Sequence, residues 1–189
     1  MTTIMPCFDR FPAEGNIIGR LLAGYGELEL EMCACVAATA GDLDGAIKKL
    51  FGVRGEYKRI ETADLMMKGA YASVGLASKY NRTMKNMDWC RTVRNQYSHC
   101  NWYDTTAEGL CFVDLEHTAK VKRKIKSVVA HRYPIDAVLL KRQESYFNHV
   151  RECYWHLAEA YRIARKKAFK GSSPLHLWPP QLARPPKHN

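Results

Sequence analysis

No proline interrupts the chain between Pro12 and Pro134, so this long stretch is free to form helices. Apolar residues recur through it at intervals of three and four, the spacing that lines one face of a helix. The first helix is expected over residues 14–40, and its apolar face consists of Ile18, Leu21, Leu22, Tyr25, Leu28, Met32, Cys35 and Val36. The sequence therefore predicts a mainly helical protein.

Four further helices are expected, and two of them have recognisable N-caps. Asp42 caps a short helix, and Asp136 caps the last one, where Ile135 and Leu140 have the spacing of a hydrophobic staple. These helices are expected over residues 43–51, 56–80, 83–100 and 137–169. Because short connections favour packing side by side, the fold class is expected to be all-α, an antiparallel helical bundle of about five helices.

Residues 101–134 depart from the helical pattern. Asn101 to Gly109 is typical of a loop, and the apolar segment from Leu110 to Leu115 suits either a strand or the start of a helix. A small hairpin or an irregular insertion is therefore expected around 101–134.

Proline is concentrated near the end of the chain, where five of the eight prolines lie between Pro174 and Pro186. Residues 171–189 are accordingly expected to form a Pro-rich, flexible tail, whose apolar residues remain able to dock on the body or on a partner: Leu175, Leu177 and Trp178. Residues 1–170 have a natural size for one domain, so a single helical domain is expected there.

Composition narrows the class of protein. No apolar run approaches the roughly 20 residues of a membrane span, and Asp9 and Arg10 are unlike the apolar core of a signal peptide. The seven cysteines are odd in number and form no CxxC, which indicates reduced thiols and a cytoplasmic location. The net charge of +10 favours polyanionic partners, although a solvated basic surface would have the same composition.

The helix expected over residues 83–100 carries polar residues on one face. Its buried stripe is expected to be Cys90, Val93, Tyr97 and Cys100, and the opposite face collects Arg91, Arg94, Asn95, Ser98, His99 and Trp102. Asn95 and His99 are four residues apart, so the amide is expected to orient the imidazole. Arg94 and His99 are five apart, about 140° around a straight helix, so either the helix ends there or a second copy completes the site.

This set of side chains suits metal-independent cleavage of RNA. The 2′-hydroxyl attacks the adjacent phosphate when a base removes its proton, an acid protonates the leaving oxygen, and a cation stabilises the negative charge. Histidine can act as the base or the acid, and arginine can bind phosphate through two donors. Because one chain supplies only one such set of a histidine and an arginine, a twofold dimer is the simplest way to complete the site.

The segment Arg94-Asn95-x3-His99 resembles the signature of HEPN domains, in which an arginine and a histidine are separated by four to six residues and a polar residue often follows the arginine. The resemblance implies a helical bundle, a homodimer with the two motifs facing each other and, in active members, a metal-independent endoribonuclease that acts on single-stranded RNA. It implies that Arg94 contacts phosphate, that His99 is catalytic and that Asn95 orients the site.

The same resemblance implies a toxin or phage-defence context with a separate antitoxin or regulator. Some HEPN proteins are binding modules without nuclease activity. The runner-up is therefore a non-catalytic helical module that binds nucleic acid or a protein partner, and a structural protein with no nucleic-acid role is a third reading. In these readings Arg94 and His99 interact with solvent or with the helix end, or they form salt bridges within the bundle.

The RNA-binding surface is expected to include a basic run after the motif and two residues beside it. These residues are Lys120, Lys122, Arg123, Lys124, Lys126, Arg91 and Trp102. A charged, solvated face is the alternative for the basic run, and folding back over the core is the alternative for Trp102.

No metal and no cofactor is expected. His149, Cys153 and His156 lie on one side of the last helix, but a fourth zinc ligand is not evident. The glycines are scattered, and no phosphate-binding glycine-rich loop is present.

Overall fold

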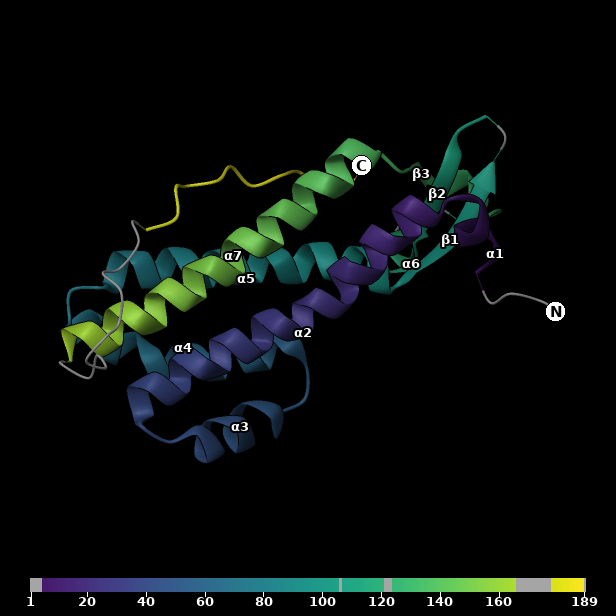
Figure 1. The fold of residues 1–189 in the computed structure, drawn as a ribbon. Coiled ribbons are helices and arrows are strands. Elements are labelled where there is room, and N and C mark those ends of the chain that lie inside the picture. Colours follow the sequence, from purple (N-terminus) through teal and green to yellow (C-terminus); the bar gives the residue numbers. More distant parts are fainter. Residues whose placement is uncertain (1–4, 106, 121–123, 166–177, 189) are drawn as a thin grey trace. The chain divides into compact units, whose positions relative to one another are not determined.

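The computed structural model describes residues 5–105, 107–120, 124–165 and 178–188. These residues are mainly helical, with a small antiparallel sheet (Figure 1). The three longest helices are α2 (Pro12–Ala40), α5 (Ala77–Ser98) and α7 (Ala137–Ala164). Nowhere in the described residues is a helix both long and apolar enough to cross a membrane.

The chain forms two compact units, and each draws on early, middle and late parts of the sequence. Unit 1 comprises Met1–Ala23, Thr92–Tyr146 and Ala183–Asn189, and unit 2 comprises Gly24–Arg91 and Phe147–Leu182. Because neither unit is one continuous segment, the division does not cut the chain in two, and the single helical domain expected over 1–170 stays a prediction.

Unit 1 contains a three-stranded sheet beside the ends of the long helices (Figure 1). The strands pair in the order β1-β2-β3, with Phe112 opposite both Trp102 and Tyr133. The smaller elements of this unit are α1 (Pro6–Arg10), β1 (Cys100–Thr105), β2 (Gly109–Asp114), α6 (Leu115–Ala119), the 3-10 helix η1 (Val129–His131) and β3 (Tyr133–Pro134).

An aromatic cluster holds the sheet of unit 1 to its helices. The Trp102 ring lies 5.2 Å from Phe8 in α1 and 5.6 Å from Phe112 in β2, measured between centroids. Tyr97, in the last turn of α5, lies 5.9 Å from Phe112. Offset aromatic contacts of this kind add to the stability from apolar burial, so the last turn of α5 is anchored on the sheet.

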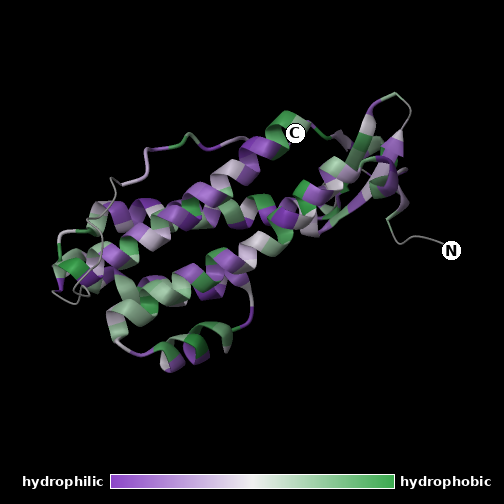
Figure 2. Cartoon of the chain, in the orientation of Figure 1, coloured by the Kyte–Doolittle hydropathy of each residue, from purple (hydrophilic) through white to green (hydrophobic). Residues whose placement is uncertain are grey.

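Unit 2 is helical and adds α3 (Leu43–Phe51) and α4 (Glu56–Ser73) to parts of the long helices. Tyr71 of α4 stacks on Tyr80 of α5 at 5.2 Å, and the Cys35 thiol donates to the Tyr154 carbonyl at 3.3 Å. In an ion pair with the buried Glu29, the Nη1 of Arg59 donates to both carboxylate oxygens. Strongly hydrophobic and strongly hydrophilic residues alternate around α3 (Figure 2).

Three predicted boundaries are wrong. The helix expected over 56–80 ends at Ser73, because Gly75 has a φ of 76°. The next helix begins at Ala77 and not at Thr83. The loop expected over 101–109 contains strand β1 up to Thr105. The expected hairpin is present, and the Asp136 cap is confirmed, since its carboxylate accepts from the amides of Val138 and Leu139.

The expected flexible tail is only partly described. Residues 178–188 have no regular secondary structure, as predicted, but Trp178 lies over the ammonium of Lys79 in unit 2 and His188 is buried in unit 1. These two residues are therefore packed against the protein. Leu175 and Leu177 lie outside the described residues.

Candidate functional site

The candidate motif lies where α5 ends, within unit 1. Arg94 and Asn95 are in the last helical turn and are half-buried, whereas His99 follows the final helical residue, Ser98, and is exposed. Tyr97 faces the interior. The helix therefore ends between the two predicted catalytic residues, which is one of the two arrangements expected from their five-residue separation.

Asn95 is in contact with Arg94. The Arg94 Nη1 donates a hydrogen bond of 3.1 Å to the Asn95 Oδ1. The amide oxygen of Asn95 thus restrains the guanidinium of Arg94. The predicted orientation of the His99 imidazole by Asn95 stays a prediction.

The imidazole of His99 faces a carboxylate that sequence reasoning missed. Its Nε2 lies 3.9 Å from Oε1 of Glu116, and the two side chains are 51% and 60% exposed. The pair is an ion pair only when the ring is protonated. An acceptor beside a solvent-accessible imidazole can restrict the orientation of the ring.

The hairpin explains why Glu116 reaches the motif. Cys100 pairs with Asp114 across β1 and β2, and the Leu115 amide donates to the His99 carbonyl at 3.2 Å. Asp114 then caps α6, since its carboxylate accepts from the His117 amide at 2.8 Å. Asp114 follows the apolar segment of β2 and comes directly before the residues of α6. An aspartate in that position is the local signal that could have predicted this helix start.

Trp102 is not available to stack on a base in this conformation. Its side chain is 8% exposed and packs among Phe8, Tyr97 and Phe112. Trp102 lies in strand β1 with its side chain buried, whereas the helical spacing predicts it on the polar side of the motif, just past the helix end. Of the two readings of Trp102, folding over the core is the one observed.

The basic run is partly described. Lys120, Lys124 and Lys126 are all exposed, so their ammonium groups are accessible to a polyanion. Lys122 and Arg123 lie outside the described residues. The prediction that this run binds RNA therefore rests on three accessible lysines.

Arg91 belongs to unit 2, where its guanidinium has partners. It donates two hydrogen bonds to Asp88 Oδ1, at 2.8 and 2.9 Å, and its Cζ lies 5.6 Å from the centre of the Tyr57 ring. A role of Arg91 in RNA binding stays a prediction.

The described residues contain no group of three or more His, Cys, Asp or Glu side chains that could hold a metal ion. His149 and Cys153 contact each other at 3.5 Å, while the His156 Nδ1 lies 3.0 Å from the Glu152 carbonyl. Burial lowers the pKa of His149 and raises the pKa of Cys153 to about 11. Burial thus keeps the imidazole and the thiol of this contact neutral near pH 7.

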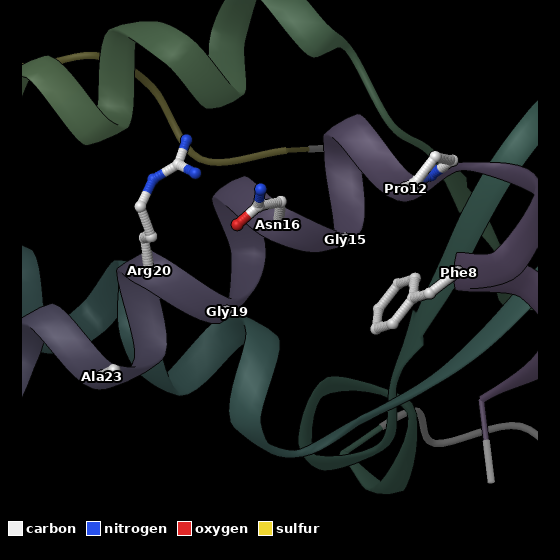
Figure 3. Close-up of a pocket in the computed structure, with 7 residues that line it drawn as sticks. All are labelled: Phe8, Pro12, Gly15, Asn16, Gly19, Arg20 and Ala23. Carbon is white, nitrogen blue, oxygen red and sulfur yellow. The ribbon is translucent and has the colours of Figure 1, made fainter.

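A groove of about 500 Å³ lies elsewhere in unit 1, between α1 and the start of α2 (Figure 3). It is lined by Phe8, Pro12, Gly15, Asn16, Gly19, Arg20 and Ala23. Arg20 forms an ion pair with Glu144. None of the predicted site residues lines this groove, so it is separate from the motif.

The end of α5 presents two groups that can act on a phosphodiester: a guanidinium hydrogen-bonded to an amide, and an exposed imidazole. The accessible lysines lie farther along the chain, in the basic run. Comparison with known proteins adds no relative. No protein-family model, no curated protein and no solved structure matches this chain.

Proposed function

We propose that this protein is a HEPN-like endoribonuclease that cleaves single-stranded RNA without a metal ion. The observation that carries the proposal is the placement of His99 in solvent directly after α5, with Arg94 restrained by Asn95 one turn earlier. A catalytic imidazole must reach a substrate proton, and an exposed position at a helix end permits that approach.

The proposed reaction is transesterification. The 2′-oxygen attacks the adjacent phosphorus while His99 removes its proton, the bond to the 5′-oxygen breaks, and that oxygen receives a proton from a second acid. The products are a 2′,3′-cyclic phosphate and a 5′-hydroxyl. Arg94 binds the phosphate oxygens and stabilises the negative charge that accumulates on them.

The second acid is the reason for proposing a homodimer. One motif supplies one histidine, and a base and an acid must act on opposite sides of the phosphate. Two chains related by a twofold axis would provide two histidines and two arginines in one cleft. We propose with it the antiparallel bundle of about five helices that the apolar periodicity predicts, and a toxin or defence role under a separate regulator, as the resemblance implies.

A reducing compartment such as the cytoplasm is part of the proposal. Six of the seven cysteines are buried in the described structure, and burial raises the pKa of Cys35 to about 12. Buried protonated thiols behave as small apolar core residues, which is consistent with the odd count and irregular spacing.

A non-catalytic module that binds nucleic acid is the second candidate. The exposed ammonium groups of Lys120, Lys124 and Lys126 favour it, because phosphate contacts alone provide sequence-independent affinity. In this case His99 would have no chemical role.

The deciding experiment incubates the purified protein with labelled single-stranded RNA in EDTA, beside His99→Ala and Arg94→Ala variants. We expect cleavage with a cyclic-phosphate end, and a loss of about a hundredfold or more in each variant, since proton transfer and charge stabilisation each contribute about that much. Matched controls are His131→Ala and Arg142→Ala, which change the same residue types elsewhere in unit 1.

The outcomes separate the candidates. Intact RNA in every sample, together with salt-dependent binding, would support the binding module. Cleavage that survives both motif substitutions would exclude Arg94 and His99 as the site.

A further inference from the structure

His188, in the late segment of the chain, is buried against the helical turn of the candidate motif in unit 1. His188 is 5% exposed, although it belongs to a stretch whose composition predicts an irregular tail. Its contacts are with Gln96 and Tyr97 of α5, with the start of α7 and with the Phe112 ring. Gln96 and Tyr97 lie between Arg94 and His99 in the sequence, so the tail contacts the motif helix at its functional turn.

The ring of His188 connects two helices. Its Nε2 accepts a hydrogen bond of 3.0 Å from the Asp136 amide, and its Nδ1 lies 2.7 Å from the Tyr97 hydroxyl. Because Nε2 is an acceptor, the proton of the neutral ring is on Nδ1 and is donated to the Tyr97 oxygen. The Tyr97 hydroxyl in turn donates to Gln143 Oε1 at 2.5 Å.

The tail backbone is held equally closely. The Gln96 amide donates to the His188 carbonyl at 2.7 Å and accepts from the His188 amide at 3.2 Å. The Gln143 amide donates to the Pro186 carbonyl at 2.9 Å. Gln96, Tyr97 and Gln143 are all buried, and buried polar groups are costly to leave unpaired. Undocking of the tail would therefore leave unpaired groups inside the motif turn.

The tail is placed to support the motif instead of covering it. Within the motif turn, the tail makes its polar contacts with the buried residues Gln96 and Tyr97, whereas His99 is exposed. An autoinhibitory segment would be expected to occupy the accessible side of the site.

We propose that docking of tail residues 186–188 holds the last turn of α5 in its functional geometry, with His188 as a positioning residue, so that undocking of the tail switches the candidate site off. The catalytic consequence rests on the proposed function, whereas the structural consequence does not. Small displacements of catalytic groups cost roughly a hundredfold in rate, so a loosened turn is sufficient to inactivate the site.

The test compares the full-length protein with His188→Ala, His188→Gln and Lys187→Ala. Lys187 is the neighbouring control, and Gln can replace part of the imidazole's hydrogen bonding. Amide hydrogen exchange is measured for residues 94–99 and, as a reference in unit 2, for α3. RNA cleavage in EDTA is measured in parallel. These two readouts separate the position of the motif turn from its activity.

We expect His188→Ala to accelerate amide exchange over residues 94–99 by about tenfold or more. Without the His188 hydrogen bonds, local opening of this turn costs less free energy and therefore occurs more often. Exchange in α3 should not change. In His188→Ala the kcat for RNA should fall by roughly tenfold to a hundredfold, with little change in KM. His188→Gln should recover part of the protection from exchange and part of the kcat. Lys187→Ala should match the unaltered protein in both measurements.

Each contrary result has a distinct meaning. Unchanged exchange at residues 94–99 in His188→Ala would overturn the positioning role. Faster exchange with undiminished cleavage would overturn the switch. No cleavage by the unaltered protein would overturn the proposed nuclease, together with the catalytic consequence, while exchange would still decide whether His188 positions the turn.

Discussion

A single buried imidazole makes the tail contact sensitive to pH. Burial lowers the pKa of His188 below its ordinary value of 6.5, and this effect exceeds the opposing influence of the negative charge of Asp136. The titratable groups that face the ring are Tyr97, whose pKa is raised by burial, and Asp136, whose carboxylate accepts from the first amides of α7. The docked form therefore requires a neutral ring.

The sign of the pH dependence follows from linkage. The undocked or unfolded state binds the proton more readily, so the stability from docking is complete above about pH 6.5 and is lost as the pH falls through the lowered pKa. We expect urea unfolding of the unaltered protein to lose more stability between pH 7.5 and 5.5 than unfolding of His188→Gln does. The variant is the necessary comparison because burial lowers the pKa of His149 as well. Equal losses would contradict the prediction.

For single residues, the sequence predicts only those positions that follow from helical spacing. The polar placement of Arg94, Asn95 and His99 could be predicted from helical periodicity, and the burial of Val93 and Tyr97 followed from the same pattern. Glu116 and His188 could not be found this way, because the hairpin and the tail bring them to the motif. His188 is 92 positions from Gln96 in the sequence, and periodicity carries no information over that distance.

At the scale of elements, the hairpin that carries Glu116 depends on a glycine. Gly109 has a φ of 74°, and the preceding turn is held by the Glu108 amide, which donates to the Thr105 hydroxyl at 2.9 Å. A Cβ at Gly109 would also lie 3.6 Å from Phe11, which is ordinary contact, so backbone strain is the larger effect.

We expect Gly109→Ala to lower the free energy of unfolding by about 1–2 kcal/mol, the cost of a left-handed conformation for a residue with a Cβ. Gly19→Ala is the matched control, since Gly19 is helical and a Cβ there would have no neighbour within 4 Å. The free energy of unfolding of Gly19→Ala should exceed that of the unaltered protein by about 0.5–1 kcal/mol. Chemical denaturation measures both changes, and equal shifts in the two variants would show that strain at Gly109 is unimportant.

Helix ends were predictable where a side chain caps them. The Asp42 cap is confirmed, because its carboxylate accepts from the Gly45 amide at 2.9 Å, and α3 spans Leu43–Phe51 as expected. The break between α4 and α5 was missed because alanines and apolar residues continue through it. The turn there depends on Gly75, whose φ is 76°. Strand β1 was missed because Asn101-Trp102-Tyr103-Asp104 becomes a strand only by pairing with β2.

For the molecule as a whole, the net charge of +10 predicts salt-dependent association with RNA. Each phosphate contact on a single strand contributes about 0.7 to the slope of log affinity against log salt. Replacing Lys120, Lys124 and Lys126 together by Ala should therefore reduce that slope by about two if all three contact phosphate. Filter binding from low to moderate salt measures the slope. An unchanged slope would exclude this surface from the RNA interface in either functional reading.

The proposed dimer makes the most demanding prediction, because it requires two chains to share one reaction. In an equal mixture of unaltered and His99→Ala chains that exchange freely, a mixed dimer retains a single His99. If the base and the acid come from different chains, only dimers of two unaltered chains should cleave, so the activity should fall to roughly a quarter, whereas a site confined to one chain should keep roughly half of it. Sedimentation must first show a dimer and the mixed species. A fall to a quarter would show that both histidines act on one phosphate, and a retained half from a proven mixed dimer would restrict the chemistry to a single motif.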